Sequence, residues 1–156
     1  MKKFLVIGNP IEHSLSPELH NYWIKNNGID AIYEKQKLNE NELEQIISKV
    51  KDKKINGVNV TVPFKKKVIP YLDELSFEAQ STQSVNTIYL KDNKVVGHNT
   101  DIFGFETSIK KSDYNLNNKE VLILGAGGVV SSIIFALIKM KVSKIKICNR
   151  TKEKAE

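Results

Sequence analysis

Strand-length apolar runs alternate along this chain with segments of helical periodicity, and no other feature constrains its fold as strongly. Such alternation is typical of an α/β fold in which helices pack on a mostly parallel sheet. The expected strands are residues 4–8, 31–38, 58–62, 85–90, 94–97, 120–124 and 144–148. The expected helices are residues 17–27, 43–50, 101–111, an apolar helix ending at Met140, and a short helical region between residues 64 and 75.

Several element ends carry recognisable start and stop signals. Ser16 precedes a proline and has the character of a helix N-cap, and Gly28 stands where a helix end favours a left-handed residue. Asn39 and Glu42 have the spacing of a capping box. The turn dipeptide at residues 92–93 predicts a hairpin between the strands on either side of it.

A polar stretch at residues 112–119 divides the chain into two expected units, residues 1–111 and 112–156. The second unit begins a new strand–helix–strand pattern. Residues 151–156 have the character of a further helix that begins without any stop signal, so we expect the chain to be cut inside a larger domain.

Composition favours a globular, cytoplasmic protein. Hydrophobic residues make up 40% and charged residues 27% of the chain, and the longest apolar stretch, residues 129–138, is far shorter than the roughly 20 residues of a membrane span. Cys148 is the one cysteine, so no intrachain disulfide is possible. The net charge is +6, but Arg150 is the one arginine and no basic–aromatic interleaving occurs, which argues against a nucleic-acid partner. No metal-ligand spacing is present.

A glycine-rich segment, Gly125-Ala126-Gly127-Gly128, lies between an expected strand and an expected helix. In this context glycines let the backbone approach a pyrophosphate, which the amide groups at the positive end of the helix can bind. The dinucleotide fingerprint has Gly or Ala at its third position, where this chain has Val130. The alternative is a tight turn without a ligand, and the surrounding strand–helix–strand pattern favours the cofactor.

The next strand is followed by Asn149-Arg150-Thr151. NAD-binding domains usually carry an acidic residue at this place to hold the ribose hydroxyls. A carboxylate would repel a 2′-phosphate, whereas a guanidinium and a hydroxyl would bind it. The segment therefore predicts NADP rather than NAD, although a surface arginine at a strand end is the plainer alternative.

Polar motifs of the first unit follow expected strands, where ligands bind in parallel α/β sheets. These motifs are residues 8–17, 59–65, 85–87 and 97–101. Their individual residues also have purely structural interpretations: a helix cap for Ser16 and Asp101, strand packing for Thr61, an edge position for Asn86, and solvated surface for Lys65.

Taken together and in this order, the motifs from Gly8 to Thr151 resemble those of shikimate dehydrogenases. The resemblance implies a two-domain oxidoreductase, a monomer or homodimer, that interconverts 3-dehydroshikimate and shikimate with NADP(H) on the route to chorismate and aromatic amino acids. Residues 1–111 would form the substrate-binding and catalytic domain. Residues 112–156 would form the first βαβ unit of a Rossmann NADP-binding domain.

The resemblance also implies residue roles. It assigns substrate binding to Ser14, Ser16, Thr61 and Asn86, catalysis to Lys65 and Asp101, and cofactor binding to Gly125, Ala126, Gly127, Gly128, Val129, Asn149, Arg150 and Thr151. A conversion between an alcohol and a ketone needs one proton-transfer group at the reacting oxygen. Asp101 would favour the charged ammonium of Lys65, so we expect shikimate oxidation to rise with pH above neutrality.

Two departures and two alternatives accompany this interpretation. The family pattern usually has Gly-Ala where this chain has Gln83-Ser84, and smaller residues at 129 and 130. A quinate/shikimate dehydrogenase is one alternative, and the pair Ser14 and Ser16 favours shikimate alone. The other alternative is a truncated binding fragment without catalysis, since an incomplete βαβ unit leaves strand edges unpaired.

Overall fold

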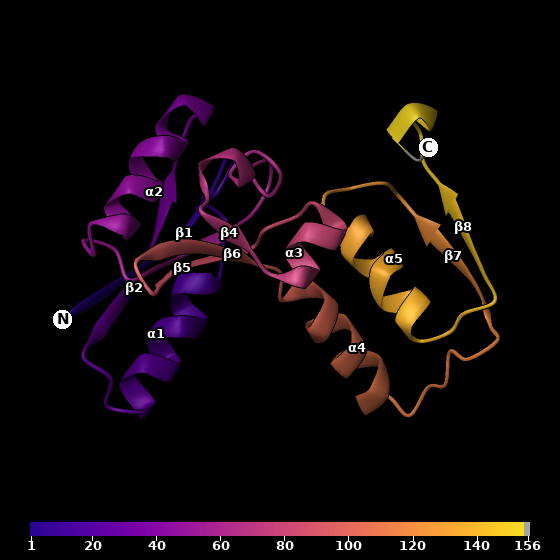
Figure 1. Cartoon of the computed structure of the whole chain (residues 1–156). Coiled ribbons are helices and arrows are strands. Elements are labelled where there is room, and N and C mark those ends of the chain that lie inside the picture. Colours follow the sequence, from indigo (N-terminus) through magenta and orange to yellow (C-terminus); the bar gives the residue numbers. More distant parts are fainter. Residues whose placement is uncertain (155–156) are drawn as a thin grey trace.

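The computed structural model describes residues 1–154, which form two α/β units side by side (Figure 1). The first unit contains a six-stranded sheet and the second a two-stranded sheet. Among the described residues, no helix has both the length and the apolar character needed to cross a membrane. The expected α/β class is confirmed.

The six-stranded sheet has the order β2-β1-β3-β5-β6-β4. Its strands are β1 Lys2–Gly8, β2 Ala31–Lys37, β3 Gly57–Val60, β4 Glu74–Leu75, β5 Thr87–Lys91 and β6 Lys94–His98. β2, β1 and β3 are mutually parallel and β4 is parallel to β6, whereas β5 runs antiparallel to both of its neighbours. The sheet is therefore mostly parallel, as expected, with one inserted hairpin.

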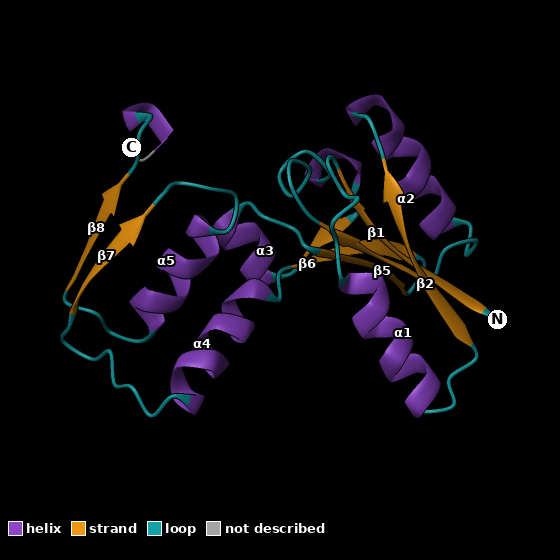
Figure 2. Cartoon of the chain, turned by 180° about the vertical axis from the view of Figure 1, so that it is seen from behind, coloured by secondary structure: helices purple, strands orange, loops and turns teal. Residues whose placement is uncertain are grey.

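Helices α1 (Ser16–Asn26) and α2 (Leu43–Lys51) cover opposite faces of this sheet (Figures 1 and 2). α2 buries the apolar residues that recur at helical spacing, and they join the main core. These residues are Leu43, Ile46, Ile47 and Val50. α1 buries no residue completely, and its Ile24 packs against a smaller cluster that contains Tyr33.

Most of the predicted start and stop signals of helices and turns are found in the structure. The Asn39 amide donates to Glu42 Oε2 at 2.7 Å, which confirms that half of the capping box. Gly28 has φ +62° after α1, and residues 92 and 93 both have positive φ in the hairpin turn, as predicted. Ser16 as N-cap is wrong: Leu15 is the N-cap, and Ser16 is the first residue of the helix.

Between residues 58 and 82 the structure differs in detail from two predictions. The third strand ends at Val60 rather than at residue 62, before a loop that contains Pro63. Residues 64–75 contain no α-helix but a 3-10 turn at Ile69–Tyr71 and the short strand β4. The helix of this region lies later, at α3 (Phe77–Thr82), where the Ser76 hydroxyl caps the first turn by accepting from the Ala79 amide at 3.2 Å.

The second unit consists of the parallel strands β7 (Glu120–Leu124) and β8 (Lys144–Cys148) with α5 (Val130–Lys139) between them in sequence. Helix α4 (Asp101–Lys111) leads into it through the polar stretch. α3, α4 and α5 lie together at the junction of the two units (Figures 1 and 2). A 3-10 turn covers Lys152–Lys154, and the rest of the expected final helix lies outside the described residues.

Candidate active site

The polar motifs of the first unit meet at one edge of the six-stranded sheet. β1 and β3 are parallel, so the loops after Gly8 and Val60 leave the sheet at the same edge. The hairpin adds the start of β5 and the end of β6, because Asn59 pairs with Thr87 and Thr87 with His98. Topology thus gathers side chains that are far apart in sequence.

Lys65 and Asp101 form an ion pair at this edge, with 2.7 Å between Nζ and Oδ2. Lys65 follows the buried Phe64, and its carbonyl oxygen accepts a hydrogen bond from the Val85 amide at 2.8 Å. Asp101 is the first residue of α4. The two side chains are 15% and 21% exposed, so the pair is partly shielded from solvent and still open to a ligand.

Asn86 holds the other oxygen of the same carboxylate. Its Nδ2 donates to Asp101 Oδ1 at 2.8 Å and to Thr100 Oγ1 at 2.8 Å. Its Oδ1 accepts from the Thr100 amide and from the Thr87 hydroxyl, each at 3.0 Å, which sets the orientation of the carboxamide. Each oxygen of Asp101 therefore has a donor, and the carboxylate is held in one orientation.

Ser14, Ser16 and Thr61 line a cavity of about 280 Å³ between the loops that follow β1 and β3. All three side chains are half-buried. Their hydroxyl groups are neutral donors that suit the oxygens of a small carboxylate. The ion pair does not line this cavity, but Thr61 and Lys65 belong to the same loop. The site thus has a hydroxyl-lined pocket and a charged pair connected by one short segment.

Gly8 allows the two loops to approach each other. A Cβ atom on Gly8 would lie 2.6 Å from Thr61 Cγ2, 3.0 Å from Ile11 Cδ1 and 3.1 Å from the Val62 carbonyl oxygen. A backbone hydrogen bond of 3.0 Å from the Asn9 amide to the same carbonyl joins the loops. Any larger residue would push the pocket walls apart.

Glu12 supports this pocket and was not predicted from the sequence. Its Oε2 accepts from the Ile11 amide at 3.0 Å, and its Oε1 pairs with Lys37 Nζ at 3.1 Å. A hydrogen bond from its own amide, followed by those from Lys37 and the Ile11 amide, lowers the pKa of Glu12 to about 2. The carboxylate thereby ties the loop that carries Ser14 to β2.

The glycine-rich turn has the backbone that a phosphate group needs. Gly125 has φ +104°, which favours glycine, and its amide donates to the Cys148 carbonyl at 2.7 Å. A Cβ atom on Gly127 or Gly128 would meet nothing within 4 Å, so packing inside the protein does not demand glycine there. Within the described residues, the amides of Gly127, Gly128 and Val129 donate no hydrogen bond. The turn therefore fits a phosphate-bearing cofactor at the N-terminus of α5.

Asn149 joins this turn to the end of β8. Its Oδ1 accepts from the Ala126 amide at 3.2 Å, and its Nδ2 donates to the Thr151 carbonyl oxygen at 2.6 Å. Arg150 is exposed and makes no ion pair within residues 1–154. An exposed guanidinium that makes no ion pair among residues 1–154 suits an anionic group of a ligand.

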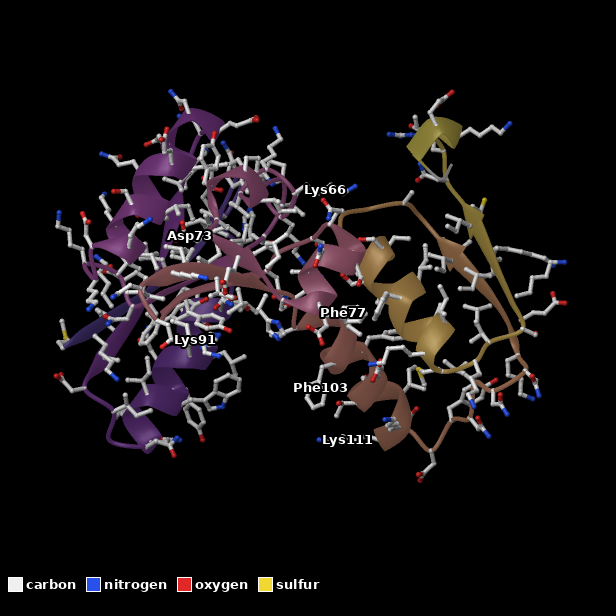
Figure 3. All side chains as sticks on the ribbon, viewed as in Figure 1. Lys66, Asp73, Phe77, Lys91, Phe103 and Lys111 are labelled. Carbon is white, nitrogen blue, oxygen red and sulfur yellow. The ribbon has the colours of Figure 1, made fainter. Side chains whose placement is uncertain are left out.

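One cavity lies between the loop of residues 61–67 and the glycine-rich turn. It has a volume of about 320 Å³ and is lined by Val62, Pro63, Lys65, Lys66, Lys67 and Gly128. Figure 3 shows Lys66 at the side of the first unit that faces the second. Lys65 of the ion pair and Gly128 of the turn therefore line the same space.

Two of the residues that depart from the family pattern, Gln83 and Ser84, lie just before Asn86 in the sequence. Gln83 is in the left-handed region, with φ 49° and ψ 43°, after the end of α3. Ser84 is completely buried, and its hydroxyl has no hydrogen-bond partner within the described residues. Gly and Ala would avoid both problems, which gives a physical reason for the usual pattern.

No group of three or more His, Cys, Asp or Glu side chains in the described part of the chain is arranged to hold a metal ion. The site as it stands consists of hydroxyls, one carboxamide and one lysine–carboxylate pair.

Comparisons with known proteins agree with this geometry. One family model, the shikimate dehydrogenase substrate binding domain, matches residues 6–88, and a second, shikimate / quinate 5-dehydrogenase, matches residues 107–156. A shikimate dehydrogenase (NADP(+)) of Pelagibacter ubique is 61% identical over 154 residues, which cover 99% of this chain and 58% of that protein.

Two solved structures are similar over nearly the whole chain. A shikimate dehydrogenase of Aquifex aeolicus has a TM-score of 0.92 at 41% identity, covering 99% of this chain and 58% of that one. A shikimate 5-dehydrogenase of Thermus thermophilus, in complex with NADP(H) and shikimate, has a TM-score of 0.89 at 34% identity, with the same coverage of 99% and 58%. This chain thus spans 58% of the length of each of these three relatives. It belongs to the shikimate dehydrogenase family.

Proposed function

We propose that this chain carries the substrate site and the catalytic pair of an NADP-dependent shikimate dehydrogenase, which interconverts 3-dehydroshikimate and shikimate. The observation that carries the proposal is the ion pair of Lys65 and Asp101, whose Lys65 lines the same cavity as Gly128 of the glycine-rich turn. The Thermus thermophilus relative binds shikimate and NADP(H) together, which supports the same pair of ligands here.

The substrate's carboxylate would lie in the hydroxyl-lined pocket, held by Ser14 and Ser16. Thr61 and Asn86 would hold ring hydroxyls, and their separation from the serines would fix which carbon of the ring faces the ion pair. Neutral donors suit this task because the ligand has one charged group and several hydroxyls.

In the reduction, the Lys65 ammonium donates its proton to the carbonyl oxygen as the carbon accepts a hydride, and the oxygen becomes a hydroxyl. When bound, NADPH would supply that hydride. Asp101 holds the ammonium at 2.7 Å and directs it, so the positive charge is in place before negative charge develops on the oxygen. In the oxidation, Lys65 accepts the proton, and the reaction therefore speeds up as pH rises.

For the cofactor, the free amides of Gly127, Gly128 and Val129 would bind the pyrophosphate at the positive end of α5. Arg150 and Thr151 would bind the 2′-phosphate. The name of the Pelagibacter ubique relative includes NADP(+), which supports this choice. The same roles imply that residues 1–111 act as the substrate-binding and catalytic domain and 112–156 as the start of the cofactor domain.

We propose a cytoplasmic location, because the chain has a single cysteine and a globular composition. The resemblance to shikimate dehydrogenases leads us to propose a monomer or homodimer. Quinate carries an extra hydroxyl on the carbon that bears the carboxylate, so the pocket of Ser14 and Ser16 decides between quinate and shikimate. We propose shikimate as the preferred substrate, and quinate is the matched competitor to test.

The test is NADP⁺ reduction on addition of shikimate, measured with this chain and with any longer protein that contains it. We expect Lys65→Ala to lower kcat by about 10²–10⁴-fold. Lys51→Ala is the matched control, because Lys51 also pairs with an aspartate, Asp73, at 3.4 Å but lies away from the site. Equal loss in both variants, or full activity in Lys65→Ala, would contradict the assigned role.

Activity only in a longer protein would mean that this chain is a part of the enzyme that cannot act alone. No reduction of NADP⁺ by shikimate in either form, with binding of shikimate retained, would favour the binding role without catalysis. Faster reduction with quinate than with shikimate would replace the substrate in the proposal.

A further inference from the structure

The Asn99 side chain lies between the catalytic pair and the helix of the cofactor turn. The residue is 1% exposed, in the link between β6 and α4. Its Oδ1 accepts a hydrogen bond of 2.9 Å from the Asp101 amide, which places the residue that pairs with Lys65. Its Nδ2 lies 2.8 Å from Ser132 Oγ on α5. One carboxamide thus touches both the start of α4 and the helix that follows the glycine-rich turn.

Ser132 is completely buried, and it lies one turn or less from the glycine-rich segment. Two further side-chain contacts between α5 and the helices of the first unit involve residues farther along α5. Phe135 packs edge to face on Phe77, with 6.0 Å between ring centroids, and Lys139 pairs with Glu106 at 2.7 Å. Figure 3 shows Phe77 at this junction. The Asn99–Ser132 contact is therefore the one nearest to both ligand-binding elements.

The NH₂ group of Asn99 has three acceptors around it but only two hydrogens to donate. Besides Ser132 Oγ, these acceptors are Thr82 Oγ1 at 3.0 Å and the Ser84 carbonyl oxygen at 2.9 Å. Without the Ser132 hydroxyl both hydrogens still have partners on the first unit. Loss of the Ser132 hydroxyl should therefore cost little stability, and it would remove the hydrogen bond that ties the Asn99 carboxamide to α5.

We propose that Asn99 is a positioning residue for the reaction: it keeps the Asp101–Lys65 pair in register with α5, and so with the cofactor turn. This inference rests on the proposed function, since it concerns the same ion pair. Hydrogen bonds that are shielded from water determine the relative position of the groups they join more strongly than exposed ones do. A small displacement of a catalytic group is enough to slow a reaction.

The first test is independent of catalysis. Amide hydrogen exchange of Asp101 can be followed by NMR on this chain. It should be at least about ten-fold faster in Ser132→Ala than in the wild type, because Asn99 Oδ1, which accepts from that amide, is no longer tied to α5 through the carboxamide. Ser131→Ala is the matched control, since Ser131 is the preceding residue of α5 and its side chain makes no hydrogen bond within the described residues. We expect Tm of both variants within about 4 °C of the wild type.

The second test uses whichever form of the protein reduces NADP⁺ with shikimate. Ser132→Ala should lower kcat by about ten-fold with KM for shikimate changed less than about two-fold, because Ser14 and Ser16 are untouched. Its effect on kcat should be non-additive with that of Asp101→Asn, as expected for residues that act through each other. Ser131→Ala should keep both kinetic constants.

Unchanged exchange at Asp101, or additive effects on kcat, would overturn the inference. A fall in Tm with kcat preserved would also overturn it and would assign Asn99 to stability alone. If Ser132→Ala does not fold, Ser132→Cys decides in its place, since its thiol is a weaker acceptor and must change exchange in the same direction. Faster exchange in a protein without any shikimate-dependent activity would overturn the proposed function and leave the Asn99 contact established.

Discussion

Replacing Gln83-Ser84 by Gly-Ala is expected to stabilise this protein. Gln83 has φ 49° and ψ 43°, a left-handed conformation in which its Cβ atom crowds the backbone. The Ser84 hydroxyl is completely buried without a partner among the described residues. The Ser84 carbonyl oxygen, which accepts from Asn99 Nδ2 at 2.9 Å, is retained in both substitutions.

The magnitude follows from these two costs. A non-glycine residue in the left-handed region costs about 1–2 kcal/mol of stability. Glycine removes this strain, but the greater freedom of the unfolded glycine chain offsets about 0.5–1 kcal/mol of the gain. Gln83→Gly should therefore add about 0.5–1 kcal/mol to the free energy of unfolding. Ser84→Ala removes an unsatisfied buried hydroxyl, whose burial costs about 1–3 kcal/mol.

Urea unfolding and thermal melting measure the effect. At about 2–4 °C per kcal/mol for a chain of this length, the double variant should melt about 3–16 °C higher than the wild type. Gln83→Ala is the control, because it keeps the Cβ atom and the strain and should gain nothing. The reasoning is refuted if Gln83→Gly is no more stable than Gln83→Ala, or if Ser84→Ala lowers Tm.

Three further predictions concern the site directly. Asp101→Asn should lower kcat for shikimate oxidation by about 10²-fold, as measured by steady-state kinetics, because Lys65 Nζ would lose the carboxylate that directs it at 2.7 Å. Gly8→Ala should lower the free energy of unfolding by about 1–3 kcal/mol and raise KM for shikimate, because its Cβ atom would lie 2.6 Å from Thr61 Cγ2. The pKa of Glu12 is lowered from 4.5 to about 2, so its contribution to stability is complete above pH 4.5 and is lost as pH falls towards 2. Urea unfolding at several pH values should show that Glu12→Gln loses this part of the acid dependence, and an unchanged dependence would contradict the tether to Lys37.

Elements with strong local signals could be predicted from the sequence. α2 has its apolar residues at regular helical spacing, and the hairpin of β5 and β6 has a turn dipeptide that accepts positive φ. The structure of the region between Val60 and α3 could not be predicted, because its 3-10 turn and its strand β4 are too short to show a periodic pattern. α3 has six residues and is held by the Ser76 cap and by packing on α5, neither of which follows from a periodic pattern.

The site residues could be named from their motifs, and the structure brings Lys65, Asn86 and Asp101 into one hydrogen-bonded group. Their roles stay predictions that the kinetic experiments test. The supporting contacts could not be derived from the sequence, because they depend on tertiary approach. Gly8 matters only once two loops meet, and Asn99 reaches Ser132 across 33 positions of the chain.

The central claim is the arrangement of substrate in the site, and the most direct measurement is a crystal structure of the protein with shikimate bound. We predict the substrate carboxylate at Ser14 and Ser16, and a ring hydroxyl within about 3 Å of both Lys65 Nζ and an oxygen of Asp101. That hydroxyl should face the cavity bordered by Gly128. A carboxylate bound directly to Lys65, with no hydroxyl at the ion pair, would contradict the account.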